Sequence, residues 1–453
     1  MTEVPRIDID DVEATISNLE RVGVGVVRLL YADLQGIARG KDIPLAKFST
    51  VAEDGIAFCA AVLTTDLRDT AVVGGEKGYQ DLVARPDLRT LRLVPWQSDI
   101  AWCIADLHEI GGARWPVCPR GLLRTAVRAF TELGLSPVAG PELEFFLLER
   151  DETAATGFRR YVDEPSRVYT VGHVSDPKGV VLEMLRACDR LGLGAFAANH
   201  EFMSSQYEIN VHHSTALDAA DRAFLLKTTV KEIAAREGMV ATFMGKPFND
   251  QGGSGFHVHL SLEDVDGENA FADDAAGDGL SASARRFAAG VLEHAPALTA
   301  LLAPTVNAYK RFVPGSLAPT RANWGHDNRT ALIRVPKERG RATRLEVRAG
   351  DGTANAYLLL AALLAAGLDG IRRALEPPPL VSGDSYTLDD AAAGAPLPGD
   401  LGAALDALAA DPVLREALGE PLVEAFLEVK RFELERFRRW VTDWELDEYA
   451  AHL

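Results

Sequence analysis

The stretch that most constrains the fold of this chain is a glycine-rich loop at 252–255 followed by an alternating segment at 256–262. In the alternating segment, His257, His259 and Ser261 fall on one face of a strand, and the apolar side chains between them fall on the other. The glycines before it let the backbone approach a ligand closely. We therefore predict a strand whose polar face, together with the preceding loop, belongs to a binding site.

Three further segments alternate in the same way, over 142–145, 206–211 and 344–348. Their polar positions are acids, amides and arginines: Glu142, Glu144, Gln206, Glu208, Asn210, Arg344, Glu346 and Arg348. If the four strands share one sheet, its apolar face rests on helices and its other face gathers these groups. A solvated sheet face carries scattered polar residues, so the sorting indicates a functional surface.

The chain of 453 residues exceeds one typical domain, so we expect two. Residues 1–110 are predicted to form a small α+β domain, with a helix over 7–21 and a hairpin over 24–44. Residues 111–453 are predicted to form a larger α+β domain, with helices over 120–133, 178–191, 218–237, 285–302 and 355–374. We expect an exposed hairpin or loop at 263–279 and an extended surface segment at 376–400.

Composition excludes several classes of protein. The formal net charge of −19 argues against nucleic acid as a partner. No apolar run approaches membrane-spanning length, and the first residues are neither a basic nor an apolar leader, so we expect a cytoplasmic protein without a membrane partner. The four cysteines are widely spaced and are predicted to be buried free thiols: Cys59, Cys103, Cys118 and Cys188.

Carboxylates dominate the polar face. Glu142 and Glu144 lie two apart on one strand, so both point the same way, and an unsupported pair would repel. A solvated strand face explains this pair equally well when it is taken alone. Four more potential ligands join the pair if the strands are neighbours: Glu201, Glu208, His257 and Glu346. Such a cluster needs cations, and its chemistry favours Mg²⁺ or Mn²⁺, although a His-x-His pair alone also suits zinc hydrolases and structural histidines.

Arginines supply the opposite charge, and five lie between 311 and 348: Arg311, Arg329, Arg334, Arg344 and Arg348. Any single one is explained by surface solvation. Together with a metal-binding acid cluster they indicate bidentate recognition of phosphate and carboxylate groups, as phosphoryl transfer requires. The chain has no phosphate loop, no GxGxxG between a strand and a helix, and no GxSxG, so ATP would bind to a different scaffold.

Seven segments, in order along nearly the whole chain, resemble motifs of the glutamine synthetase family: 31–36, 141–144, 200–208, 246–261, 307–314, 328–334 and 344–348. The resemblance implies a β-grasp-like N-terminal domain over 1–110. It implies a catalytic domain over 111–453, built around a curved antiparallel sheet backed by helices. It also implies homo-oligomeric rings of six subunits, stacked as twelve, in which a neighbour's N-terminal domain completes each active site.

The resemblance also implies a role for each site residue. The ligands of a first divalent metal would be Glu144, Glu201 and Glu208, and those of a second would be Glu142, His257 and Glu346. The positions that bind ATP would be His259, Ser261, Arg334 and Arg344. Glutamate would be held at Gly253, Arg311 and Arg348. Arg329 would stabilise the transferring phosphoryl group, and Asp33 would come from the neighbouring subunit and carry part of the amine's charge or act as a base.

Two positions depart from the pattern of family members that use ammonia. Those members carry a glutamate at the position of Leu317, in the segment 311–317, which we call the flap. They carry an asparagine at the position of Gly252. An ammonium ion that enters a desolvated pocket without a counter-charge loses hydration worth several kcal/mol. Loss of both side chains is expected to enlarge the acceptor side of the site. We therefore predict an ATP-dependent ligase that forms γ-glutamyl amides from glutamate and an organic primary amine.

Two alternatives remain open at this point. One is an ammonia-using glutamine synthetase in which another acid replaces the one missing at Leu317. The other is a non-catalytic family member kept as a structural or regulatory assembly, against which the complete set of six metal ligands argues. Tyr386 lies near the position where some bacterial members carry an adenylylated tyrosine, but its surroundings match poorly, so this regulation is not expected.

Overall fold

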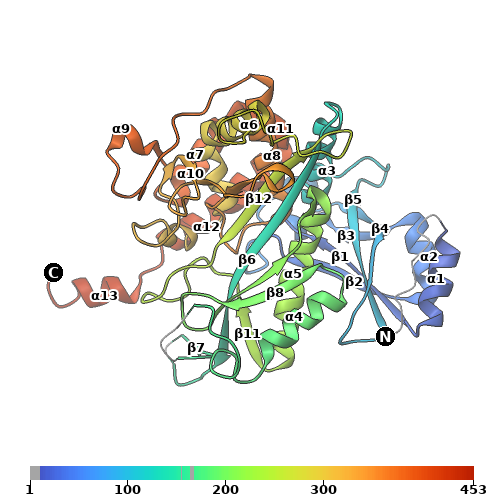
Figure 1. Cartoon of the computed structure of the whole chain (residues 1–453). Helices are drawn as coiled ribbons and strands as arrows, with labels where there is room; N and C mark the ends of the chain where they lie inside the picture. The colour runs from blue at the N-terminus through green and yellow to red at the C-terminus, as the bar shows by residue number, and fades with distance from the viewer. Residues whose placement is uncertain (1–10, 155, 164–167) are drawn as a thin grey trace.

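The computed structural model describes residues 11–154, 156–163 and 168–453, and it divides them into a small lobe and a large one (Figure 1). The small lobe holds a five-stranded sheet in the order β2-β1-β5-β4-β3. Its strands are β1 (Val26–Ala32), β2 (Ala38–Pro44), β3 (Ile56–Cys59), β4 (Asp81–Leu93) and β5 (Ile100–His108). The central strands β1 and β5 run parallel and the other pairs are antiparallel, which is a β-grasp-like arrangement.

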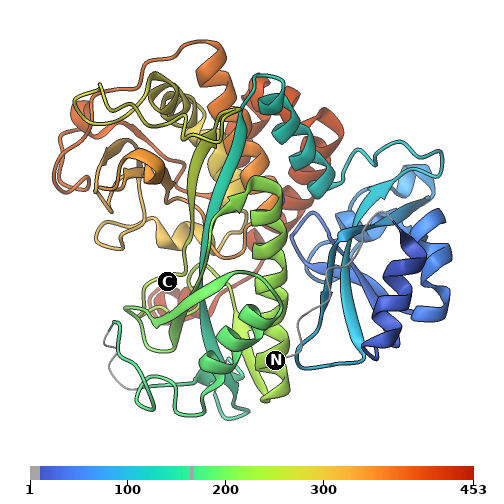
Figure 2. The same ribbon diagram turned by 45° about the vertical axis from the view of Figure 1, so that its right-hand side comes forward.

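The central strands of the small sheet are apolar on both faces because both faces are covered. One face packs on α1 (Val12–Arg21) and α2 (Leu45–Asp54), with Leu29 and Cys103 in that core. The opposite face, including Trp102, packs into the core of the large lobe. Near-continuous apolar runs are what two-sided burial requires of a strand. The small sheet is thereby fixed beside the large lobe, as Figure 2 shows.

The four polar-faced segments do share one sheet, whose main path runs β14-β15-β16-β12-β6-β9-β8. Its long central strand is β6 (Ser136–Arg150), flanked by β12 (Phe256–Glu263) and β9 (Gln206–Val211). The remaining strands on that path are β8 (Ala195–His200), β14 (Trp324–His326), β15 (Ile333–Val335) and β16 (Leu345–Val347). Three short strands also pair with β6: β7 (Phe158–Arg160), β10 (Ser214–Thr215) and β11 (Met239–Thr242). The two-stranded sheet pairs β13 (Arg321–Ala322) with β17 (Ala395–Pro396).

Helices cover the apolar face of the large sheet, as the alternation predicts. The side chains of Leu143, Val258 and Leu260 are buried there. The helices nearest the sheet are α3 (Pro119–Thr131), α4 (Val180–Arg190) and α5 (Ala216–Arg236), and α5 lies along β6 (Figure 2). Behind them α8 (Ala356–Arg372) is buried on nearly every side and packs against α3 and α6. A helix that is apolar all round belongs in such a position.

The rest of the large lobe is helical. Its helices are α6 (Ala282–Glu293), α7 (Ala295–Leu302), α9 (Asp390–Ala393), α10 (Leu401–Ala410), α11 (Pro412–Leu418), α12 (Glu420–Arg438) and α13 (Asp443–Tyr449), with short 3-10 turns at Ala60–Thr64, Gly75–Lys77, Ala308–Arg311 and Gly340–Ala342. None of the described helices combines the length and the apolar character needed to cross a bilayer.

Most predicted elements are confirmed, and two predictions are wrong in detail. The single helix expected over 285–302 is two helices, which meet at His294 because Pro296 suits the first turn of a new helix and not a helix interior. Cys59 is exposed, whereas the other three cysteines are buried free thiols. The helix expected over 7–21 is described only from residue 11 on, so its expected start at 7–10 lies outside the described residues. The division at residue 110 stays a prediction, and it agrees with the change of sheet between β5 and β6.

Candidate active site

Strand register explains how acids far apart in sequence meet. In the antiparallel pairing of β6 with β12, Glu142 lies opposite His257. On the other side of β6, Glu144 lies opposite Glu208 of β9. On the far side of β12, Glu346 of β16 lies opposite His259. Because each strand presents alternate residues to one face, these side chains gather on the face opposite the helices.

Three predicted ligands form a compact group. Glu142, His257 and Glu346 each offer one ligand atom, and these atoms lie within 4.8 Å of one another. Glu346 is only 1% exposed. Burial alone would raise its pKa, but the charge of Arg348 and the neighbouring histidines outweighs burial and lowers the pKa to about 2. Glu346 is therefore ionised at neutral pH and able to act as a ligand.

The second predicted set, Glu144, Glu201 and Glu208, is coupled by charge. Glu144 accepts hydrogen bonds from Gln206 Nε2 at 2.8 Å and from the Gly255 amide at 2.7 Å. Burial, and then the negative charge of Glu144, raises the pKa of Glu201 to about 7. Burial and the surrounding carboxylates also raise the pKa of Glu208 well above its ordinary value. These acids are therefore packed more closely than their own charges favour.

The six predicted metal ligands have the chemistry that hard divalent cations prefer. Five carboxylates and one imidazole on one face supply the oxygen-rich ligand chemistry that Mg²⁺ and Mn²⁺ prefer. The raised pKa values of Glu201 and Glu208 record a repulsion that a bound cation would relieve. The six predicted metal ligands thus occupy one surface of the sheet.

Beside the acids lies a pocket of about 260 Å³ that includes three of the four predicted nucleotide positions: His259, Ser261 and Arg344. Arg344 Nε donates to His259 Nδ1 at 3.2 Å, so the other ring nitrogen carries the proton and donates to Glu142 at 3.0 Å. This chain of contacts links the pocket to the acid cluster. The fourth position, Arg334, bridges Glu346 at 2.6 Å and Asp327 at 2.7 Å.

The positions predicted to hold glutamate also converge. Arg311 ends a 3-10 turn, is buried, and donates to the Gly350 carbonyl at 3.0 Å. A Cβ added at Gly253 would lie 2.3 Å from Arg311 Cγ, so only glycine fits there. Arg348 pairs with Glu346 and also donates to the Arg329 carbonyl at 3.1 Å. The predicted glutamate and phosphoryl residues are thus joined by direct contacts.

Comparison with known proteins agrees with this geometry. The family model described as glutamine synthetase, catalytic domain, matches residues 116–449. The glutamine synthetase of Halobacterium salinarum is 36% identical over 450 residues, covering 97% of this chain and 96% of that protein. The glutamine synthetase of Thermotoga maritima is 36% identical over 446 residues, covering 96% and 99%.

The chain belongs to the glutamine synthetase family. Solved structures agree with the membership. An ADP complex of GmaS covers 100% of both chains with 33% identity and a TM-score of 0.86, and ligand-free GmaS covers 97% of this chain and 99% of its own with 32% identity and a TM-score of 0.85. Members of the glutamine synthetase family are ATP-dependent carbon–nitrogen ligases that use divalent metals, bind glutamate, and commonly form oligomers.

The two positions that depart from the ammonia-using members of the glutamine synthetase family have a structural explanation only in part. Leu317 is 39% exposed and adopts a left-handed φ of 58°, which is unusual for a branched side chain. Beside Gly252, a Cβ would lie 3.1 Å from Met203 Cε and 3.2 Å from Met203 Cγ. The enlargement expected at Gly252 stays a prediction, and the flexible side chain of Met203 lies next to that position.

Asp33 is held by several contacts within the chain. It is 1% exposed, and its carboxylate accepts from Arg39 at 2.9 Å and from the backbone amides of Gln35 and Ile37. Its backbone carbonyl accepts from Asn355 at the start of α8, so this carbonyl joins the two lobes. The role expected of Asp33 in the site of a neighbouring subunit stays a prediction.

Two charged residues near the glutamate positions were missed by sequence reasoning. Asp351 is buried behind Gly245, where an added Cβ would meet its Oδ2 at 2.5 Å, and its charge acts on Arg311. Lys227 of α5 is partly buried, lies between the rings of Phe243 and Phe256 and donates to the Ala354 carbonyl at 2.6 Å. Neither residue belongs to one of the four alternating segments, so the alternation of polar and apolar residues did not indicate them.

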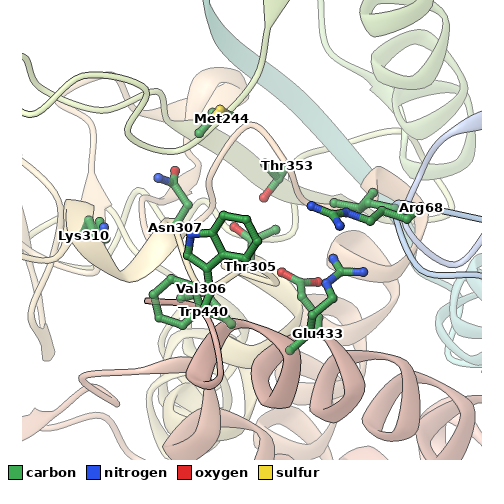
Figure 3. A pocket seen from close by; sticks show the side chains of 12 residues that line it. Arg68, Met244, Thr305, Val306, Asn307, Lys310, Thr353, Glu433 and Trp440 are labelled. Carbon is green, nitrogen blue, oxygen red and sulfur yellow. The ribbon is translucent and has the colours of Figure 1, made fainter. Parts of the chain in front are cut away.

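A larger pocket has a volume of about 420 Å³, and Figure 3 shows side chains that line it. Apolar side chains make much of its wall, including Met244, Val306 and Trp440, and Arg68, Lys310 and Glu433 also line it. None of the predicted site residues lines it. Its apolar character does not suit a highly charged nucleotide, so the smaller pocket beside His259 is the better candidate for ATP.

Proposed function

We propose that this enzyme is a glutamate–amine ligase, which joins glutamate to an organic primary amine at the expense of ATP. The γ-carboxylate of glutamate attacks the terminal phosphorus of ATP, ADP leaves, and a γ-glutamyl phosphate forms. The amine nitrogen then attacks the γ-carbon, phosphate leaves, and the nitrogen loses a proton to give the γ-glutamyl amide. Monoamines, ethanolamine and polyamines are the candidate acceptors.

The role proposed for each residue follows from its charge: the acids bind cations, and the arginines bind phosphate and carboxylate groups. Two divalent cations, held by Glu144, Glu201 and Glu208 and by Glu142, His257 and Glu346, would neutralise phosphate oxygens. His259, Ser261, Arg334 and Arg344 would bind the nucleotide. Gly253, Arg311 and Arg348 would hold glutamate, and Arg329 would stabilise the transferring phosphoryl group. The similar structure with bound ADP supports the nucleotide part of this proposal.

The observation that carries the choice of amine is Leu317. An apolar side chain in the flap gives ammonium no counter-charge, whereas the alkyl part of an organic amine gains by contact with it. Met203 beside Gly252 adds a second, adaptable apolar side chain near the glutamate positions. The flap and its neighbours therefore favour an acceptor with a carbon chain over ammonia.

Initial-rate measurements on the purified enzyme test this function. Phosphate release is followed with ATP, Mg²⁺, glutamate and either ammonia or one of a panel of primary amines. At least one organic amine should exceed ammonia in kcat/KM by about tenfold or more, as one apolar contact in a pocket allows. Ammonia exceeding every organic amine would refute the proposed acceptor and leave a glutamine synthetase.

We propose in addition a ring-shaped homo-oligomer in the cytoplasm. Exposed apolar side chains gather near the C-terminus, at Trp440, Val441, Trp444 and Leu446, where contact with another subunit would remove them from water. The buried thiols Cys103, Cys118 and Cys188 suit a reducing compartment. Light scattering of the purified protein should give the mass of six or twelve subunits, and a monomer would contradict the assembly.

A further inference from the structure

A short segment at 383–386, between α8 and α9, contacts two loops of the active site at once. Tyr386 Oη donates to the Ala318 carbonyl at 2.8 Å, next to Leu317 in the flap. On its other side, the Ser385 amide donates to Thr330 Oγ1 at 2.9 Å, and the Gly383 carbonyl accepts from Asn328 Nδ2 at 2.8 Å. We call residues 383–386 the clasp.

The flap needs such support because its backbone is strained at Leu317. A left-handed φ at a non-glycine residue is sterically unfavourable and persists only where the surroundings impose it. Two consecutive carbonyls are held at the end of the flap, that of Leu317 by Arg348 Nη2 at 3.4 Å and that of Ala318 by Tyr386. Ser316 Oγ adds a bond within the flap, to the Arg311 carbonyl at 2.7 Å.

The hydroxyl of Tyr386 is suited to a lasting contact. Burial raises the pKa of Tyr386 above its ordinary value of 10.0, so the group stays protonated and remains a donor at neutral pH. The side chain is half-buried, and its hydroxyl contacts the end of the flap at the Ala318 carbonyl and at the side chain of Ser316. Phenylalanine would fill the same volume without the donor.

The second loop held by the clasp carries Arg329, the residue proposed to stabilise the transferring phosphoryl group. Asn328 and Thr330 flank it, and both bond to the clasp. Arg348 donates to the Arg329 carbonyl as well as to that of Leu317. The clasp and Arg348 thus connect the acceptor side of the site to its phosphoryl side.

We propose that Tyr386 is a positioning residue that fixes the position of the flap around the acceptor amine. The clasp also fixes the position of the flap relative to residues 328–330, which include Arg329. This inference rests on the proposed function, since the flap is assigned to the acceptor there. The two contacts of the clasp act on different steps. Tyr386 governs the binding of the amine, and Thr330 governs the rate of phosphoryl transfer.

Two isosteric variants separate these effects. Tyr386→Phe removes the bond to the flap and should raise the KM for the amine by about three- to tenfold, with kcat at saturating amine and the KM for ATP within about twofold of wild type. Thr330→Val removes the bond from the Ser385 amide and the bond to Asn328 Oδ1, and it should lower kcat by about three- to tenfold, with the KM for the amine nearly unchanged. Tyr449→Phe, which removes an exposed hydroxyl on α13, is the matched control.

The split between KM and kcat decides the inference. An unchanged KM for the amine in Tyr386→Phe overturns it. Equal losses for all three substrates, together with a lower melting temperature, also overturn it, because they indicate a structural role alone. The same measurements with ammonia keep this test separate from the proposed function. If ammonia proves the better acceptor, the proposed function fails, and a raised KM for ammonia in Tyr386→Phe still supports the clasp.

Discussion

Glu201 shows, at the scale of one residue, why the acid cluster calls for a cation. Its carboxylate accepts from Asn199 at 2.7 Å, yet burial and the charge of Glu144 raise its pKa to about 7. The hydrogen bonds with Asn199 and with the Phe202 backbone, which lower the pKa, do not offset the loss of water and the repulsion. In the metal-free protein a proton therefore occupies a carboxylate that a metal would otherwise engage.

The pH dependence of metal binding follows from this shift. The folded-state pKa of Glu201 lies above its ordinary value of 4.5, so its contribution to stability is present below about pH 4.5 and is lost as the pH rises through about 7. We expect the rise in melting temperature on adding Mg²⁺ to chelator-treated protein to be larger near pH 7.5 than near pH 5.5, measured by thermal unfolding. Glu201→Gln should reduce that difference, and an equal rise at both pH values would contradict the assignment.

Leu317 is the second residue whose chemistry is testable alone. Leu317→Glu places a counter-charge in the flap and should raise kcat/KM for ammonia by about tenfold or more, while it lowers kcat/KM for the preferred organic amine. Leu317→Gln has the same length without the charge and serves as the control. If Leu317→Glu leaves the ratio of the two acceptors unchanged, another group supplies the counter-charge and the flap does not select the amine.

At the scale of elements, α5 places an ionisable group beneath the central strands. Lys227 projects between Phe243 and Phe256, where burial lowers its pKa from 10.5 to about 7. Below about pH 7 both the folded and the unfolded chain hold the proton, and the full penalty of burying the charge applies. Between about 7 and 10.5 the unfolded chain binds more protons, so folding stability rises with pH in that window.

Replacement of this lysine should remove that slope. Relative to Lys227→Met, the wild-type protein should gain up to about 1.4 kcal/mol of unfolding free energy per pH unit above pH 7, measured by denaturant titration at several pH values. The exposed Lys47→Met in α2 is the control and should run parallel to wild type. Parallel curves for Lys227→Met and wild type would show that Lys227 titrates normally.

The alternating pattern predicted the four polar-faced strands, their common sheet and the side that each residue faces, because a period of two fixes these at the level of the strand. It could not fix register, on which the meeting of Glu144 with Glu208 depends. It also missed the break at His294, the buried Asp351 and the partly buried Lys227, since these follow from packing between distant segments. The catalytic role that the family motif suggested for Asp33 stays a prediction, since the single chain shows how Arg39 holds its carboxylate and does not show the contacts between subunits.

At the scale of the whole molecule, the sheet assembles one acidic face and the neighbouring pocket at His259, proposed to bind ATP, from segments spread over residues 140 to 350. The acceptor is where this chain differs from the ammonia-using pattern, at Leu317 and Gly252. The clasp lies outside the seven family motifs, and its contacts with Ala318, Asn328 and Thr330 depend on packing between distant segments. The central claim therefore concerns which nitrogen compound the enzyme accepts.

A competition experiment tests that claim most directly. The enzyme is supplied with ATP, Mg²⁺, glutamate, and equal concentrations of ammonia and several primary amines in one reaction, and the products are quantified by mass spectrometry during the initial phase. We expect a γ-glutamyl amide of an organic amine to accumulate in excess of glutamine by about tenfold or more. Glutamine as the predominant product would contradict the claim.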